Sequence, residues 1–339
     1  MDADIALILL QDGVVNGAIY ALLALSLVLV FAVTRVILIP QGELVAFGGL
    51  TYAALDAGRL PGSVWLLAVL GAAAFAAGVI ADRRIGLALV AETLLLPAAV
   101  IAAAILLAPT RPGVLIEALL AVAIVTPMAP YLYRVAFQKL ADASVLVLLI
   151  ASVGVHLALN GLGLVFFGPE GFRARGFSDA RLALGGLDVP GQALWIVGLT
   201  LLAMAGLALF FDRTLAGKAL RATAVNQLGA RLVGIATSLS GRIAFTLAGL
   251  IGAVSGVLIV PLTTVYYDSG FLIGLKGFVA AIIGGLVSYP LAAAAALLVG
   301  CVESFASFYA SAFKEVIVFT IIIPVLLWRS LRSPAEDEE

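Results

Sequence analysis

Long apolar runs follow one another along most of this chain, and they restrict its possible folds more than any other feature. Residues 18–33, 291–300 and 316–328 contain no charged side chain. Such runs leave no face for water, whereas a surface helix of a soluble protein keeps polar residues along one side. The chain is 63% apolar and 12% charged, against about 45–50% and 25% in soluble domains. The sequence therefore predicts an all-α, polytopic membrane protein.

The apolar runs predict about eleven membrane segments, because a spanning helix needs about 20 apolar residues. The first is expected at 13–34, after an apolar lead-in at 5–10. The next, 44–55, follows a Pro-Gln-Gly-Glu break and is short, so we expect a broken or tilted helix there. The others are expected at 64–80, 87–107, 115–133, 145–167, 193–211, 243–260, 271–286, 292–308 and 316–328. Residues 1–332 would form a single transmembrane domain, and 333–339 an acidic cytoplasmic tail.

The stretch 212–242 is the longest polar segment between these spans, and it predicts the orientation of the chain. It carries five cationic residues against the single acid Asp212, namely Arg213, Lys218, Arg221, Arg231 and Arg242. Cationic loops between spans lie mainly on the cytoplasmic side. We therefore expect this loop in the cytoplasm, which places the N-terminus outside and the C-terminus inside.

Two short helices are expected within this loop. The first would cover 215–224, and Asn226 would be the N-cap of a second helix that stops at Gly234. The second helix would carry an apolar stripe beside Arg231, formed by Leu228, Leu232, Val233 and Ile235. Such a helix suits docking into a groove of a cytoplasmic partner. An interfacial linker with snorkelling cations is the alternative.

Several functional classes find no support in the composition. The chain has one cysteine, Cys301, and one histidine, His156, so cysteine clusters and multi-histidine metal sites are excluded. A net charge of −1 argues against nucleic acid as a partner. No segment matches the phosphate-binding pattern GxxxxGK[ST]. We expect no cofactor bound to this chain, and ATP, if transport uses it, would bind to another subunit.

A polar stripe crosses the span 145–167. Ser152, His156 and Asn160 are spaced four residues apart and therefore share one helix face. Polar side chains in membrane helices face protein or a watery cavity, so the stripe is either part of a substrate path or a source of interhelical hydrogen bonds. Ser152 and His156 also raise the hypothesis of an intramembrane hydrolase, which would need an oxyanion site as well.

Glu303 lies in the middle of an apolar run and is another candidate for function. An isolated carboxylate inside the membrane is costly unless it is protonated or paired. Lys276 and Lys314 are candidate partners, although both are expected nearer the outer face. A structural bond between helices is the alternative.

The loop also carries a family resemblance. The order GKALRATA, five residues, ARLVGI at 217–235 resembles the cytoplasmic loop in permeases of bacterial branched-chain amino acid ABC importers. Asn16-Gly17, the run Gly-Leu-Lys-Gly-Phe at 274–278 and Glu303 are similar to further motifs of that family, in the same order. The resemblance implies the ABC importer permease fold, in which this loop contacts the ATPase. It implies coupling roles for Gly217, Arg221, Ala222, Asn226, Ala230, Arg231, Leu232 and Gly234.

The resemblance further implies partners and a location. We expect a homologous second permease subunit, two ABC ATPase subunits that use ATP, an extracytoplasmic solute-binding protein and membrane lipid, in the bacterial plasma (inner) membrane. The default substrate would be a branched-chain or related amino acid. The chain itself would not be an enzyme.

Two departures from the family pattern concern the substrate. Where the family has Val-Ile-Asn-Phe-Ala-His-Gly-Asp/Glu, residues 36–43 read VILIPQGE, and 62–107 resembles an added helical hairpin. An importer of another small organic solute (a sugar, urea or a carboxylate) is therefore one alternative. A stand-alone secondary transporter, coupled through Glu303 or His156, is another. The candidate translocation path comprises Gln41, Gly42, Glu43, Ser152, His156, Asn160 and Glu303.

Overall fold

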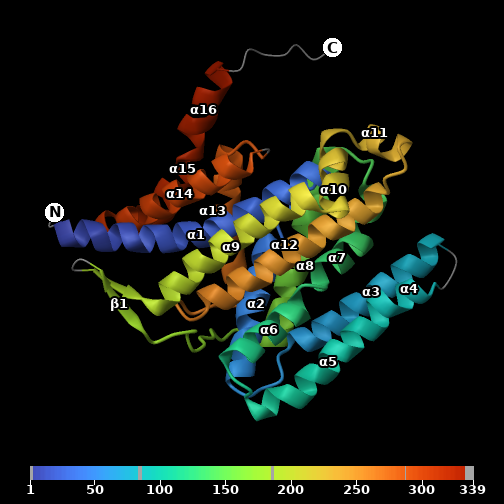
Figure 1. Cartoon of the computed structure of the whole chain (residues 1–339), viewed down its shortest axis with the longest axis horizontal. Helices are drawn as coiled ribbons and strands as arrows, with labels where there is room; N and C mark the ends of the chain where they lie inside the picture. Colours follow the sequence, from blue (N-terminus) through green and yellow to red (C-terminus); the bar gives the residue numbers. More distant parts are fainter. Residues whose placement is uncertain (1–2, 83–85, 185–186, 287, 333–339) are drawn as a thin grey trace.

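The computed structural model describes residues 3–82, 86–184, 187–286 and 288–332, and helices account for most of them (Figure 1). Among the described residues, 8 helical spans are long and apolar enough to cross a membrane. They are Asp4–Thr34, Ser63–Ile80, Leu87–Thr110, Val114–Leu140, Val145–Phe167, Gly191–Arg213, Thr237–Ile259 and Tyr289–Tyr309. The helical membrane architecture is therefore confirmed, whereas the count of about eleven segments is not.

Helix boundaries agree closely with the apolar runs. The main helices are α1 (Ala3–Thr34), α3 (Ser63–Asp82), α5 (Leu96–Leu107), α6 (Val114–Val125), α8 (Val145–Phe167), α9 (Gly191–Arg213), α12 (Thr237–Ile259) and α14 (Tyr289–Tyr309). The short α4 (Leu87–Val90) continues into α5 through a turn of π-helix, and α7 (Met128–Leu132) extends α6. The predicted lead-in at 5–10 is not separate, because α1 is continuous from Ala3.

Three predicted segments lie below spanning length. Helix α2 (Gln41–Asp56) has 16 residues and α13 (Ser269–Ile283) has 15, which is about 24 Å or less at about 1.5 Å per residue. The last predicted segment is split into α15 (Lys314–Thr320) and α16 (Ile322–Arg332). Pro324 explains the split, because it has no amide hydrogen to donate to the Thr320 carbonyl. The predicted acidic tail 333–339 lies outside the described residues.

Small residues bring the central helices together. In Figure 1, α1 and α14 run side by side along the long axis, and α2 lies at the centre of the bundle. A Cβ atom on Gly17 of α1 would lie 2.7 Å from the Leu297 Cα of α14. A Cβ on Gly48 of α2 would lie 2.6 Å from the Ala253 carbonyl oxygen of α12. Glycine at these crossings allows the close backbone approach on which helix packing in membranes depends.

The loop between α8 and α9 contains a β-hairpin that the sequence prediction missed. Strands β1 (Arg181–Leu184) and β2 (Leu187–Pro190) pair antiparallel, with Arg181 opposite Pro190. Arg175, in the same loop, pairs with Asp56 at the end of α2. The hydrogen bond from its guanidinium to Asp56 raises the pKa of Arg175. This loop is therefore tied to the end of the central helix α2.

Residues 62–107 form two antiparallel helices, α3 and α4–α5, at the edge of the bundle (Figure 1). A Cβ on Gly71 of α3 would lie 2.7 Å from the Thr93 carbonyl oxygen, so the two helices touch there. The connecting residues Arg83 and Arg84 lie outside the described residues. That this hairpin is an addition to the family's fold stays a prediction.

Candidate functional site

The polar stretch 212–242 folds into two short capped helices, as expected. Helix α10 covers Leu215–Val225 and α11 covers Gln227–Leu232. The Thr214 side chain accepts a hydrogen bond from the Gly217 amide at 2.9 Å, and Asn226 accepts one from Gly229 at 2.8 Å. Gly234 has φ +85°, a conformation that glycine adopts readily at a helix end. The predicted cap and stop are confirmed.

Helix α11 and the residue after it present apolar side chains outward. Leu228, Leu232 and Val233 are 68%, 80% and 76% exposed. Arg231 lies beside them and pairs with Asp142 at 2.8 Å, which fixes its guanidinium between α11 and the turn before α8. Exposed leucine and valine beside a cation form a surface of the kind that a protein partner covers.

The predicted coupling residues divide into outward and inward groups. Arg221, Asn226, Arg231, Leu232 and Gly234 are exposed and Ala222 is half-buried, whereas Gly217 and Ala230 are buried. A Cβ on Gly217 would lie 2.7 Å from the Phe211 Cα, so this glycine allows α10 to fold back against the end of α9. The inward pair positions the helices and has no free surface for a partner.

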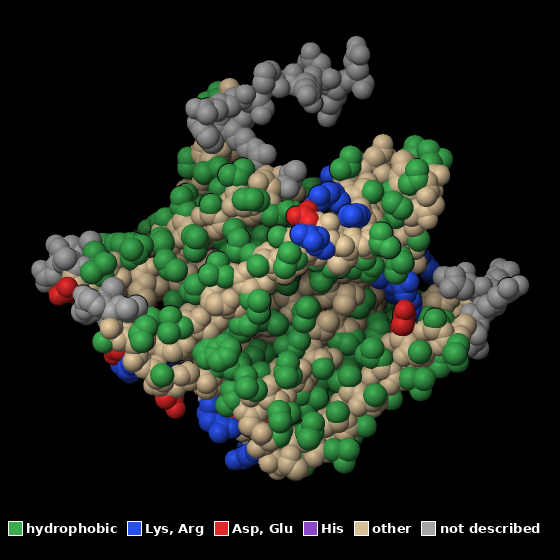
Figure 2. Space-filling model, viewed as in Figure 1, with side chains coloured by type: hydrophobic (Ala, Val, Ile, Leu, Met, Phe, Trp, Pro, Cys, Tyr) green, Lys and Arg blue, Asp and Glu red, His purple; other side chains and the backbone are tan. Residues whose placement is uncertain are grey.

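Side-chain hydrogen bonds anchor both helices to the bundle. The Gln227 amide donates to the Val33 carbonyl oxygen of α1 at 2.8 Å. The Thr223 hydroxyl of α10 lies 3.1 Å from the Ser240 hydroxyl of α12. Figure 2 shows cationic side chains gathered near α10, on a molecule whose visible surface is otherwise largely apolar. The two helices therefore form a cap that side-chain hydrogen bonds attach to the spans.

The start of α2 meets the polar stripe of α8 inside the bundle. Glu43 is 1% exposed, and its Oε1 lies 2.7 Å from His156 Nδ1. Ser152 accepts a hydrogen bond from the Ile39 amide at 3.0 Å. The His156 ring also packs on Phe271 of α13, with 4.7 Å between ring centroids. The predicted neighbours Glu43, Ser152 and His156 are thus brought together, and Asn160 lies half-buried further along α8.

The same end of α2 contains polar atoms without partners. Gln41 donates to the Ala248 carbonyl oxygen at 3.0 Å. Among the described residues, neither Gln41 Oε1 nor Glu43 Oε2 has a hydrogen-bond partner. Buried polar atoms without a partner are rare and costly. An adjoining apolar cavity of about 150 Å³ is lined by Ile39 and Phe271, among others.

Gly42 lies at the closest crossing of α2 and α13. A Cβ on Gly42 would meet the Gly270 carbonyl, and a Cβ on Gly274 would meet the Gly42 backbone. The start of α2 is therefore held by α8 on one side, through His156, and by α13 on another.

Glu303 belongs to a separate polar cluster. Its carboxylate accepts a hydrogen bond from the Tyr20 hydroxyl at 2.5 Å and pairs with Lys276 at 2.5 Å. Lys276 also pairs with Glu315 at 3.2 Å. The expectation that Lys276 pairs with Glu303 is confirmed. Lys276 is 6% exposed, so the pair is buried among the helices; its expected position nearer the outer face stays a prediction.

Comparison with known proteins identifies the family. The family model described as "Branched-chain amino acid transport system / permease component" matches residues 9–326. The chain belongs to this family. The permease is 29% identical over 328 residues to the high-affinity branched-chain amino acid transport system permease protein BraD of Pseudomonas aeruginosa, covering 94% of this chain and 92% of that protein.

Two enteric relatives match over a shorter region. The permease is 30% identical over 203 residues to the LivH permease proteins of Escherichia coli and Salmonella typhimurium, covering 57% of this chain and 65% of each of those proteins. No solved structure matches the chain significantly. The permease and its relatives are therefore similar in sequence well beyond the loop at 217–235.

Several residues of these sites were missed from the sequence. Tyr20, Glu315, Asp142 and Phe271 are distant in sequence from the partners that they contact. Lys276, by contrast, is identified from the sequence as a candidate partner of Glu303, because a lysine inside an apolar run must be paired or reach water. The others follow only from knowing which helices are neighbours.

Proposed function

We propose that this permease is the membrane-spanning subunit of an ATP-driven importer of branched-chain amino acids. Membership of the family supports this proposal, as do the names of the relatives BraD and LivH, which are high-affinity branched-chain amino acid transport permeases. The observation that carries it is the capped helix pair α10–α11, which joins two spans and exposes an apolar patch. The chain itself performs no catalysis, and ATP is hydrolysed by separate subunits.

The patch formed by Leu228, Leu232 and Val233 is the proposed contact with an ABC ATPase. Closure of two ATPases would push α11, and hydrogen bonds to α1 and α12 would pass this displacement to the spans. A second, homologous permease would complete the membrane portion, and an extracytoplasmic binding protein would deliver the solute. The membrane is the bacterial inner membrane.

This proposal gives the molecule an orientation. The Gln227–Val33 contact brings the end of α1 beside α11, and the Arg231–Asp142 contact brings the turn before α8 there. This end would be cytoplasmic. The Asp56–Arg175 pair and the bond from Arg111 to the Ala57 carbonyl gather other ends on the opposite side. Cations around α10–α11 support a cytoplasmic position for this cap. The N-terminus would then lie outside and the C-terminus inside.

The translocation path would run beside the start of α2. Gln41 and Glu43 each have a buried oxygen without a partner, and a helix that begins inside the bundle exposes backbone groups suited to a polar ligand. Ser152 and His156 fix this segment by bonding to Ile39 and Glu43. Glu303 lies in a different cluster, and its contribution to the path would be indirect.

Reconstitution tests the proposal. The permease, its partner permease and two ATPases are placed in liposomes with the binding protein, and leucine uptake and ATP hydrolysis are measured together. We expect uptake only when all components and ATP are present. Uptake by this chain alone under a proton gradient would contradict the proposal. A hydrolase activity of this chain that is lost in Ser152→Ala would favour the intramembrane hydrolase instead.

A surface variant tests the docking patch. Leu232→Ser should lower ATP-driven uptake at least about tenfold, because burying a leucine side chain in a contact contributes about 1.5 kcal/mol or more. Folding should not change, since Leu232 is 80% exposed. Leu182→Ser, on the exposed hairpin strand β1 at the far end, is the matched control. Equal uptake by the two variants would show that α11 is not the coupling surface.

A further inference from the structure

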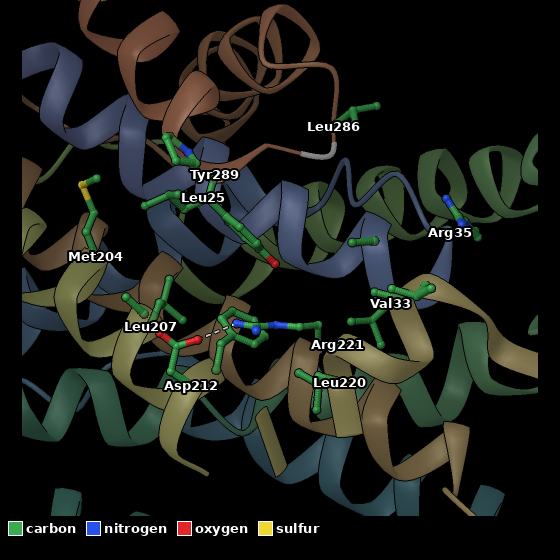
Figure 3. A pocket seen from close by; sticks show the side chains of 16 residues that line it. Leu25, Val33, Arg35, Met204, Leu207, Asp212, Leu220, Arg221, Leu286 and Tyr289 are labelled. Atoms are coloured by element: carbon green, nitrogen blue, oxygen red, sulfur yellow. Dashed lines mark hydrogen bonds and ion pairs between the residues drawn. The ribbon is translucent and has the colours of Figure 1, made fainter. Parts of the chain in front are cut away.

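A large cavity lies beside α10, apart from the polar clusters at α2 and Glu303. Its volume is about 640 Å³, and it is lined by α1, α9, α10 and the start of α14. Figure 3 shows Leu207 and Leu220 on one side of it, with Leu25 and Tyr289 across from them. The walls are mostly apolar, so the cavity favours a hydrocarbon occupant over a polar solute.

Arginine side chains lie at the edge of this apolar space. Arg221 crosses one side and pairs with Asp212 at 2.8 Å, and Arg35 lies at another edge (Figure 3). Both arginines are exposed. Arg213 and Lys218, also exposed, follow on the adjoining turns of α9 and α10. Asp212 neutralises one of these cations, and the remaining charge is positive.

The cavity lies at one end of the membrane spans. It is bounded by the last turns of α1 and α9 and by the first turn of α14, which meet at the end that carries α10 and α11. Under the orientation proposed above, that end faces the cytoplasm. An apolar space with a cationic edge at this level matches an acyl chain below an anionic headgroup. Basic pockets between spans on the cytoplasmic side bind anionic lipids in this way.

We infer that this cavity is a specific site for an anionic phospholipid. One acyl chain lies against Leu207 and Ala208, and the phosphate lies at the cationic edge to which Arg221 and Arg35 belong, because guanidinium groups suit phosphate oxygens. Because Arg221 belongs to α10, an occupied site stiffens the contact between α10 and α1. The assignment of the site to the cytoplasmic leaflet rests on the orientation under the proposed function. The test measures lipid binding and not uptake.

The test is a lipid titration of the purified complete transporter. Delipidated protein in detergent is exposed to phosphatidylglycerol or phosphatidylcholine, and retained lipids are counted by native mass spectrometry. We expect one phosphatidylglycerol to be retained preferentially. Arg35→Gln should weaken it about fivefold, because a cation near an anionic lipid contributes about 1 kcal/mol. Phosphatidylcholine binding should not change, and inorganic phosphate should not displace the lipid.

A wall variant separates this site from lipid bound elsewhere. Ala208 of α9 lines the cavity and is exposed, so Ala208→Phe fills the space and should abolish preferential retention. Gly206→Phe, on the same helix where an added Cβ meets open space, is the matched control and should retain the lipid. The inference is overturned if both variants retain it equally, if the two lipids bind with equal affinity, or if crosslinking from Ala208→Cys places the second permease in the cavity. Normal retention together with failed leucine uptake would contradict only the proposed function.

Discussion

Replacing Lys276 by methionine should be the most damaging single change in the polar cluster around Glu303. The ammonium lies 2.5 Å from Glu303 and 3.2 Å from Glu315, so it neutralises two carboxylates inside the bundle. Methionine keeps the length of the side chain and removes the charge. Glu303 would then keep only the Tyr20 hydroxyl, and two acids would face each other. Breaking a buried ion pair costs about 3–5 kcal/mol, and we expect a loss in that range.

Replacing the partner, Glu303, by glutamine should lower the free energy of unfolding by less. In Glu303→Gln, Lys276 keeps Glu315, and the amide oxygen still accepts from Tyr20. We expect a loss of about 1–3 kcal/mol, comparable to weakening a buried charged hydrogen bond. The double variant Lys276→Met with Glu303→Leu should recover part of the loss of Lys276→Met, because an apolar replacement of a buried pair is often tolerated. The asymmetry between the two single variants follows from Glu315.

Denaturant unfolding in detergent measures these differences, and a double-mutant cycle isolates the Lys276–Glu303 coupling. Lys314→Met is the matched control, because Lys314 lies 3.9 Å from Glu315 and is partly exposed, and such pairs contribute about 0–1 kcal/mol. The reasoning is refuted if Lys276→Met unfolds at the same denaturant concentration as Lys314→Met. It is also refuted if Glu303→Gln is the more damaging single variant.

Three further predictions concern the start of α2 and the coupling helices. Gly42→Ala should destabilise the permease by about 1–3 kcal/mol, because the added Cβ meets the Gly270 backbone. Gly154→Ala should not, because a Cβ there meets open space. Thermal unfolding compares the two variants. Asn226→Ala should cost about 1 kcal/mol of α11 stability and reduce the uptake per ATP hydrolysed, and Asn226→Asp, which keeps the cap, should not. Gln227→Leu should leave ATPase binding intact in a pull-down assay but lower the uptake per ATP, and unchanged coupling would show that the Val33 bond transmits nothing.

Sequence reasoning succeeded where local chemistry decides the structure. The helical membrane spans follow from apolar length, and the cap of α11 follows from Asn226, whose side chain bonds to an amide three residues on. The hairpin β1–β2 was missed because its pairing lies in a glycine-rich loop without a clear alternating pattern. The split between α15 and α16 could have been read from Pro324, since proline interrupts helical hydrogen bonding.

Contacts between distant residues could not be predicted from pattern alone. Glu43 and His156 are 113 positions apart, and Tyr20 and Glu303 are 283 apart. The stripe on α8 identified a face, but not the helix that it meets. Polarity marks a buried residue as one that needs a partner, and only the packing of glycine-lined crossings decides which partner is within reach.

The arrangement of α1, α2 and α11 gives these separate sites a mechanical relation. Gln227 bonds to the Val33 carbonyl, and a short non-helical segment after Thr34 leads from there to Gln41 at the start of α2. Ser152 bonds to Ile39 within that segment. Because the segment lacks helical hydrogen bonds, it can change shape at lower cost than a continuous span. Under the proposed function, a displacement of α11 would therefore reach Glu43 and His156 through this non-helical segment.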